Sequence, residues 1–140
     1  NNVVKNGIKI KIIGEINRLP KNLKDILKKT VNKTKQNKKI EVILALNYGS
    51  KNEIVNTFKR MNKKNVTESM INKNLYTNKI PDPEILIRTG GKKRLSNFML
   101  WQLAYSELYF LNKLWPDFSP IDLKKIITDY HKIKRNFGNI

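Results

Sequence analysis

Five residues suited to binding an anion follow a short apolar run in the second half of the sequence. They are Arg88, Gly90, Gly91, Arg94 and Ser96, directly after residues 84–87. Each arginine can donate two hydrogen bonds to phosphate oxygens, and glycine lets backbone N–H groups approach an anion closely. Ser96 adds a hydroxyl donor and could cap a following helix, whose N-terminus favours negative charge. The pattern predicts a diphosphate site, although a glycine turn with solvent-exposed arginines would have the same sequence.

A single carboxylate, Glu107, lies in an apolar and aromatic segment further along the chain. A buried charge without a partner is costly, so we expect this carboxylate to have one. The partner could be a structural arginine, or a Mg²⁺ ion held jointly with substrate phosphates. The spacing of the residues does not decide between these two alternatives.

These residues must be positioned by the surrounding strands and helices. Strands are expected at residues 8–12, 40–46, 85–87 and 108–111, and helices at 21–35, 50–61, 67–75, 98–103 and 119–134. This alternation predicts an α/β fold with a parallel sheet flanked by helices, and the apolar run 40–46 predicts a strand covered on both faces. No repeat or long linker divides the chain, so residues 1–140 are expected to form a single domain. Ligands of such sheets bind beyond the carboxyl ends of the strands, where Arg88 lies.

Three of the expected helices begin with recognisable caps. Ser50 with Glu53 three residues later predicts a capping box, and Thr67 precedes a shorter helix. Ser119, followed by proline and then Asp122, predicts the last helix start.

The composition excludes several classes of protein. Among 140 residues there is no cysteine and one histidine, so disulfides, thiolate chemistry and a histidine-based metal site are not expected. No apolar run approaches the roughly 18 residues of a membrane span, and no signal-peptide pattern is present. We therefore expect a cytoplasmic protein, with peripheral contact to a membrane surface left open.

The net charge of +18 suggests polyanion binding, but its distribution does not support a nucleic-acid interface. Residues 1–79 carry 19 basic and 5 acidic residues, and residues 80–140 carry 10 and 6. Lysine supplies 24 of the 29 basic residues, and the arginine-containing segment lies in the less basic half. Most of the lysine is expected to be solvated surface, although diphosphate substrates would profit from the positive field.

Several segments together resemble one enzyme family, the cis-prenyltransferases, of which undecaprenyl diphosphate synthase is the bacterial member. The segment EILIRTGGKKRLSNFMLWQLAYSELYF (84–110) resembles the family signature, supported by NYGSKNEI (47–54), LWPDF (114–118) and KRNFG (134–138). The resemblance implies repeated condensation of isopentenyl diphosphate with an allylic diphosphate, such as farnesyl diphosphate. It also implies a Mg²⁺-dependent homodimer whose long product serves as a lipid carrier in cell-wall synthesis.

The resemblance assigns roles to individual residues. Arg88, Arg94 and Ser96, with the turn formed by Gly90 and Gly91, match the isopentenyl diphosphate site. Glu107 matches a Mg²⁺ ligand. Arg135 and Gly138 lie in a tail that reaches the partner subunit's site in the family, although the usual tail arginine corresponds to Asn136 here.

One family landmark has no match in this sequence. The N-terminal Asp-Gly-Asn-Gly-Arg motif, which supplies the catalytic aspartate and cradles the allylic diphosphate, is absent. No catalytic residue is therefore assigned, and we expect the C-terminal part of the enzyme, lacking the first strands of the fold and inactive alone. The alternatives are a non-catalytic partner subunit or a remnant of the family, and, less in keeping with the sequence, a basic nucleic-acid-binding domain. The retained anion-site residues argue against the partner subunit.

Overall fold

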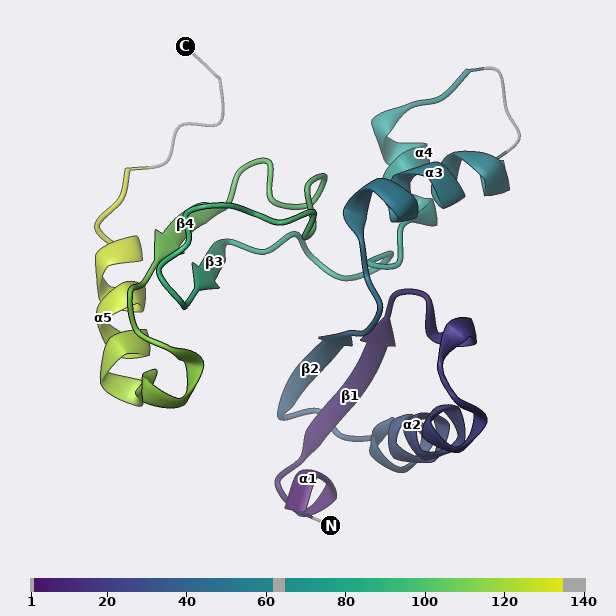
Figure 1. The fold of residues 1–140 in the computed structure, drawn as a ribbon, viewed down its shortest axis with the longest axis horizontal. Coiled ribbons are helices and arrows are strands. Elements are labelled where there is room, and N and C mark those ends of the chain that lie inside the picture. The colour runs from purple at the N-terminus through teal and green to yellow at the C-terminus, as the bar shows by residue number, and fades with distance from the viewer. Residues whose placement is uncertain (1, 62–64, 135–140) are drawn as a thin grey trace. The chain divides into compact units, whose positions relative to one another are not determined.

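The computed structural model describes residues 2–61 and 65–134, and it groups them into two compact units (Figure 1). The first unit is residues 1–79 and the second is residues 80–140. Each unit holds one pair of parallel strands. The single-domain organisation expected from the sequence stays a prediction. In the described part of the chain, no helix has the length and apolar character that crossing a membrane requires.

The first unit combines a parallel strand pair with helices. It contains α1 (Asn2–Lys5), β1 (Ile8–Ile13), the 3-10 helix η1 (Ile16–Arg18), α2 (Lys21–Thr34), β2 (Ile40–Ala45), α3 (Ser50–Met61) and α4 (Glu68–Asn74). β1 and β2 pair in register from Ile8 opposite Ile40 to Ile13 opposite Ala45. α2 packs against β1, where Ile10 is buried (Figure 1). The predicted strands 8–12 and 40–46 are confirmed to within one residue.

β2 is less covered than the sequence suggested. Ile40 is 55% exposed and Leu44 is 39% exposed, so the prediction of a strand covered on both faces is wrong. The reason is that α2 packs mainly against β1, so β2 receives less cover from this helix. An apolar run alone does not show which faces of a strand other elements will cover.

Side chains partly cover the edge of β1 that points away from β2. The Gly7 carbonyl accepts from the Lys39 N–H, in the chain leading into β2, so Gly7 faces β2. Because backbone groups alternate along a strand, those of Ile8 and Ile10, one and three residues on, both point to the opposite side. The Ile10 N–H donates to Thr34 Oγ1 at 3.1 Å, and the Ile8 carbonyl accepts from Asn37 Nδ2 at 2.8 Å. Thr34 is only 1% exposed. Two backbone groups on this edge are therefore already bonded.

A buried carboxylate links α3 to the segment after α4. Glu53 is fully buried, and its oxygens accept from the Tyr48 hydroxyl at 2.5 Å and from the Tyr76 N–H at 2.7 Å. The Tyr76 hydroxyl donates to Glu15 at 2.6 Å, which ties the end of β1 to the same network.

The start of α3 differs from the predicted one by one residue. Ser50 is the first helical residue, and the Gly49 carbonyl before it accepts from the Glu53 N–H at 2.9 Å. The predicted cap therefore lies one residue too far along the chain.

The second unit holds the other strand pair. It contains β3 (Ile85–Arg88), β4 (Glu107–Phe110), the 3-10 helix η2 (Trp115–Asp117) and α5 (Pro120–Tyr130). Ile85 lies opposite Glu107, and Arg88 lies opposite Phe110. The predicted strands 85–87 and 108–111 are confirmed to within one residue at each end.

The helix predicted over residues 98–103 is not formed. The segment is a succession of turns, with positive φ angles of 50° at Ser96, 63° at Asn97 and 46° at Met99. Left-handed backbone angles do not fit into a right-handed helix, so the i to i+4 hydrogen bond from the Leu103 N–H to the Met99 carbonyl is not extended into a helix.

The helix starts at Thr67 and Ser119 are confirmed. The Thr67 side chain accepts from the Met70 N–H, and Ser119 forms a capping box with Asp122. α5 ends at Tyr130, four residues before the predicted end at Lys134.

Candidate functional site

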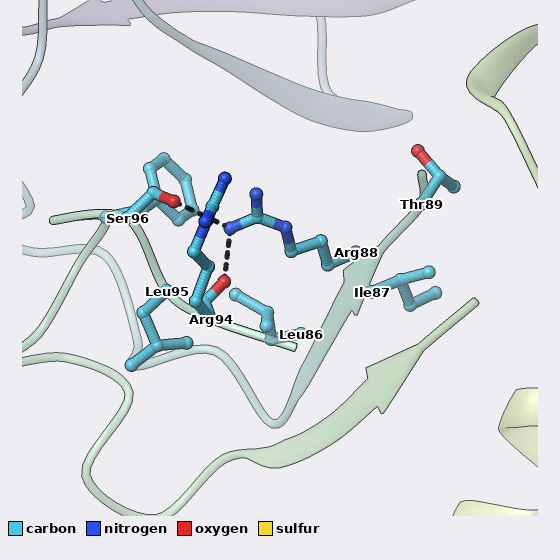
Figure 2. A pocket seen from close by; sticks show the side chains of 8 residues that line it. Leu86, Ile87, Arg88, Thr89, Arg94, Leu95 and Ser96 are labelled. Carbon is cyan, nitrogen blue, oxygen red and sulfur yellow. Dashed lines mark hydrogen bonds between the residues drawn. The ribbon is translucent and has the colours of Figure 1, made fainter. Parts of the chain in front are cut away.

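Three of the predicted anion-binding residues come together at the carboxyl end of β3. Arg88 is the last residue of the strand, and its Nη1 donates to Ser96 Oγ at 2.9 Å and to the Arg94 carbonyl (Figure 2). The side chains of Arg88 and Arg94 line the same pocket. The loop after β3 thus folds back so that its second arginine and its serine meet the strand end.

This pocket combines polar and apolar side chains, with more apolar than polar surface. It has a volume of about 340 Å³. Its lining consists of Arg88, Thr89, Arg94 and Ser96 on the polar side, and Leu86, Ile87, Leu95 and Phe98 on the apolar side (Figure 2). A ligand that combines an anionic group with a short hydrocarbon would match both parts of this lining. The sequence did not single out the apolar members, because a leucine or phenylalanine in this pattern is equally typical of a core.

Gly90 and Gly91 shape the turn through bonds to the chain after β4. The Gly90 N–H donates to the Lys113 carbonyl at 2.8 Å, and the Gly91 N–H donates to the Leu111 carbonyl at 2.9 Å. Both glycines have positive φ angles, 88° and 73°, which other residues rarely adopt. With these N–H groups bonded within the protein, Arg88, Arg94 and Ser96 are the predicted donors that line the pocket. Contact of the glycines with a ligand stays a prediction.

Ser96 takes a different local role from the one expected. No helix begins after it, so it caps none, and its hydroxyl oxygen accepts from Arg88 instead. A hydroxyl group has one proton and can accept through its lone pairs. Accepting from Arg88 leaves the Ser96 proton for donation to a ligand oxygen.

Glu107 lies at the other end of the strand pair. It is the first residue of β4, opposite Ile85, whereas Arg88 is opposite Phe110. Three residues of strand separate these levels, about 10 Å. Burial, and then the negative charges of Asp129 and Glu107, raise the pKa of Tyr109.

The described residues contain no cluster of side chains that could hold a metal ion by themselves. No group of three or more histidine, aspartate or glutamate side chains within residues 2–61 and 65–134 could hold a metal ion. Mg²⁺ bound with substrate phosphates needs one or two carboxylates beside those phosphates, and Glu107 is not among the residues lining the pocket. In the same part of the chain no ion pair joins Glu107 to an arginine, so the structural-arginine alternative is not seen among these residues. Its role as a metal ligand stays a prediction. Arg135 and Gly138, the predicted tail residues, lie outside the described residues.

The comparison with protein families shows to which family the chain belongs. Residues 1–138 match the model of the prenyltransferases that are described as undecaprenyl diphosphate synthase. The chain belongs to this prenyltransferase family. The resemblance inferred from residues 84–110 is thereby confirmed.

Relatives of this prenyltransferase chain agree with that result. An isoprenyl transferase of Rickettsia sibirica is 46% identical over 141 residues, covering 99% of this chain and 62% of the relative. The solved structure of lavandulyl diphosphate synthase from Lavandula x intermedia, in complex with dimethylallyl diphosphate, is 36% identical with a TM-score of 0.89. It covers 94% of this chain and 61% of that one. A probable undecaprenyl diphosphate synthase of Campylobacter jejuni is 34% identical with a TM-score of 0.89, covering 96% and 65%.

Two consequences follow for the prenyltransferase chain. Its α/β fold with parallel strands flanked by helices is that of the cis-prenyltransferases, as the sequence predicted. The chain also spans about 60% of the length of the curated relatives that it matches. The activity, substrates and partners of the whole protein are therefore matters of proposal.

Proposed function

We propose that this chain provides the isopentenyl diphosphate site of a cis-prenyl chain-elongating enzyme. The enzyme would condense isopentenyl diphosphate with an allylic diphosphate such as farnesyl diphosphate, and would make a long polyprenyl diphosphate. The observation that carries the proposal is the hydrogen bond of Arg88 to Ser96 within a pocket that Arg94 also lines. The names of the relatives, isoprenyl transferase and undecaprenyl diphosphate synthase, support the same class of reaction.

The lining of the pocket suits a small prenyl diphosphate better than a free phosphate. The two guanidinium groups can each donate paired hydrogen bonds to diphosphate oxygens, and Ser96 can donate one more. Leu95 and Phe98 form an apolar wall on the same pocket, where the five-carbon group would be removed from water. This arrangement would hold isopentenyl diphosphate by its charged end.

The chemical contribution of these residues is to bind and orient the substrate. Attack by the isopentenyl double bond on an allylic carbon requires the two reactants to be held in a fixed geometry, which can contribute about 7–11 kcal/mol. Arg88 is well placed for this task, because Ser96 and the Arg94 carbonyl restrict its side chain. This binding role of the arginines does not depend on Mg²⁺ or on its predicted ligand Glu107.

The proposal is tested by titrating the 140-residue chain with isopentenyl diphosphate in a calorimeter. We expect saturable binding at one site. Binding of duplex DNA, measured in parallel over a range of salt concentrations, separates the rival interpretation, since nucleic-acid binding weakens steeply with salt. Tight DNA binding without binding of isopentenyl diphosphate would refute the proposal.

We expect the 140-residue chain alone not to elongate prenyl chains. The residues assigned here hold one diphosphate, and no residue of this chain is matched to the allylic substrate. Incorporation of labelled isopentenyl diphosphate into farnesyl diphosphate, with and without Mg²⁺, measures this directly. Mg²⁺-dependent turnover at the rate of a complete isoprenyl transferase would contradict the expectation, and would show that the residues of this chain are sufficient.

We further propose a homodimer built mainly by residues 96–118. Large apolar side chains on this segment are exposed, with Trp115 at 73%, Tyr105 at 67% and Leu114 at 62%. Aromatic residues are enriched at the centres of protein interfaces. Analytical ultracentrifugation at micromolar concentration should give a dimer mass, and a Trp115→Lys variant should shift the equilibrium towards monomer. A wild-type monomer would contradict the proposed homodimer.

A cytoplasmic location with peripheral membrane contact stays a prediction. Fractionation of expressing cells would test it.

A further inference from the structure

We propose that Lys113 is a positioning residue for the arginine pocket, acting as a tie between the start of α5 and the glycine turn. This inference rests on the proposed function, because the pocket that it positions is the isopentenyl diphosphate site. Lys113 does not line the pocket, and the sequence pattern gave it no role.

The first half of the tie is a short ladder of backbone hydrogen bonds. The Leu111 N–H donates to the Arg88 carbonyl at 2.8 Å. The Leu111 carbonyl then accepts from the Gly91 N–H at 2.9 Å, and the Lys113 carbonyl accepts from the Gly90 N–H at 2.8 Å. The turn between the two pocket arginines is therefore attached to Leu111 and Lys113, which follow β4. Any movement of Lys113 would be transmitted to Gly90.

The second half of the tie is an ion pair with the capping box of α5. Lys113 Nζ lies 2.7 Å from Asp122 Oδ1. The other carboxylate oxygen, Oδ2, accepts from the Ser119 N–H at 2.9 Å and from Ser119 Oγ at 2.7 Å. These hydrogen bonds, that of Lys113 first, hold the pKa of Asp122 well below its usual range. The carboxylate is thus ionised at neutral pH.

Lys113 joins these two systems through different atoms. Its side chain holds the helix start, while its carbonyl holds the turn that leads to Arg94. An ion pair whose lysine is half exposed contributes modestly to stability on its own. Here, however, the ion pair also restricts the position of the Lys113 backbone carbonyl, which lies in a loop. Ordering the loop before the ligand arrives lowers the entropy cost of binding.

Two variants distinguish positioning from a simple charge effect. Lys113→Gln removes a positive charge, so weaker anion binding would be expected from electrostatics alone. Asp122→Asn removes a negative charge, so electrostatics alone would strengthen anion binding. If Lys113 positions the glycine turn through its ion pair with Asp122, the same variant should instead weaken anion binding. Asparagine keeps an oxygen that can accept from Ser119, so the helix cap can survive. Lys113→Arg should retain the ion pair and wild-type affinity.

The experiment measures two quantities for each variant of the 140-residue chain. One is the affinity for isopentenyl diphosphate by calorimetry, and the other is the exchange rate of the Gly90 and Gly91 amide protons by NMR. Lys113→Gln and Asp122→Asn should each weaken binding about three- to fivefold and speed amide exchange at both glycines. The matched control is Lys132→Gln, which removes an ion pair with Asp129 at the far end of α5 and should change neither quantity.

Each outcome bears on the inference. Unchanged exchange at the glycines in both variants, or tighter binding by Asp122→Asn, would overturn it. Equal losses in the Lys132→Gln control would show a general loss of stability and would overturn it too. If Lys113→Gln fails to fold, Asp122→Asn and Lys113→Arg decide the question. A wild-type chain that does not bind isopentenyl diphosphate would refute the proposed function, while the amide exchange rates would still report whether Lys113 holds the turn.

Discussion

Replacing Arg88 with alanine is expected to weaken binding of isopentenyl diphosphate about ten- to a hundredfold. A hydrogen bond to a charged group contributes about 1.5–3 kcal/mol, which corresponds to this range. The variant also removes the donor to Ser96 and to the Arg94 carbonyl, so the loop loses a contact that holds the pocket together. Arg94→Ala should lie in the same range, because this side chain lines the pocket as well. Calorimetric titration of each variant measures the effect.

A matched control for this experiment exists in the first unit. Arg18 is an exposed arginine in η1 that is not among the residues lining the pocket, so Arg18→Ala removes the same charge from another part of the sequence. We expect this control to bind as the wild type does. Arg88→Lys should recover part of the affinity, since lysine keeps the charge but not the paired donors. Wild-type affinity in both Arg88→Ala and Arg94→Ala would show that the ligand binds elsewhere.

Replacing Gly14 with alanine is expected to destabilise the protein by about 3 kcal/mol or more. Gly14 has a φ angle of 107°, a conformation that costs a residue with a side chain about 1–3 kcal/mol. An added Cβ would also lie 2.2 Å from the Leu46 carbonyl oxygen and 3.2 Å from Tyr48 Cβ. Because the obstacle is backbone at the end of β2, it cannot rotate away, and overpacking adds a similar cost. The free energy of unfolding in urea gives the measurement.

Gly90 provides a comparison that separates the cost of backbone strain from the cost of a steric clash of the added Cβ. Its φ angle is 88°, but an added Cβ would meet nothing within 4 Å. Gly90→Ala should therefore lose only the conformational part, about 1–3 kcal/mol, and not the cost of the collision. Equal losses for the two variants would mean that the contact with Leu46 does not decide the outcome. With a total stability of about 5–15 kcal/mol typical of domains, the Gly14 variant could lose much of its folded population.

Local sequence patterns predicted most of the secondary structure, because the interactions that they encode are themselves local. The alternating residues 8–12 and the caps at Thr67 and Ser119 depend on neighbours a few positions away, and all three appear in the structure. The helix predicted over 98–103 failed because positive φ angles at its start are not visible in an apolar pattern. Likewise, Glu53 looked like a cap partner, but its carboxylate is used by tyrosines from two other segments.

The site was predictable only in part. Arg88, Arg94 and Ser96 share one loop, so their proximity follows from a single turn of the chain. Glu107 belongs to a different strand, and the register that places it opposite Ile85 rather than Arg88 cannot be read from spacing. Lys113 escaped notice because its contribution is made by a backbone carbonyl, and every residue has one.

The side chains bonded to β1 determine how this part of the protein can associate. Sheets aggregate by adding strands to free edges, and a growing stack of copies needs each new strand to find open N–H and carbonyl groups. Thr34 and Asn37 occupy one of each on β1. Where α2 is docked, these two positions on the edge are therefore closed to a strand from a neighbouring chain. A strand that added on this side would first have to break both hydrogen bonds.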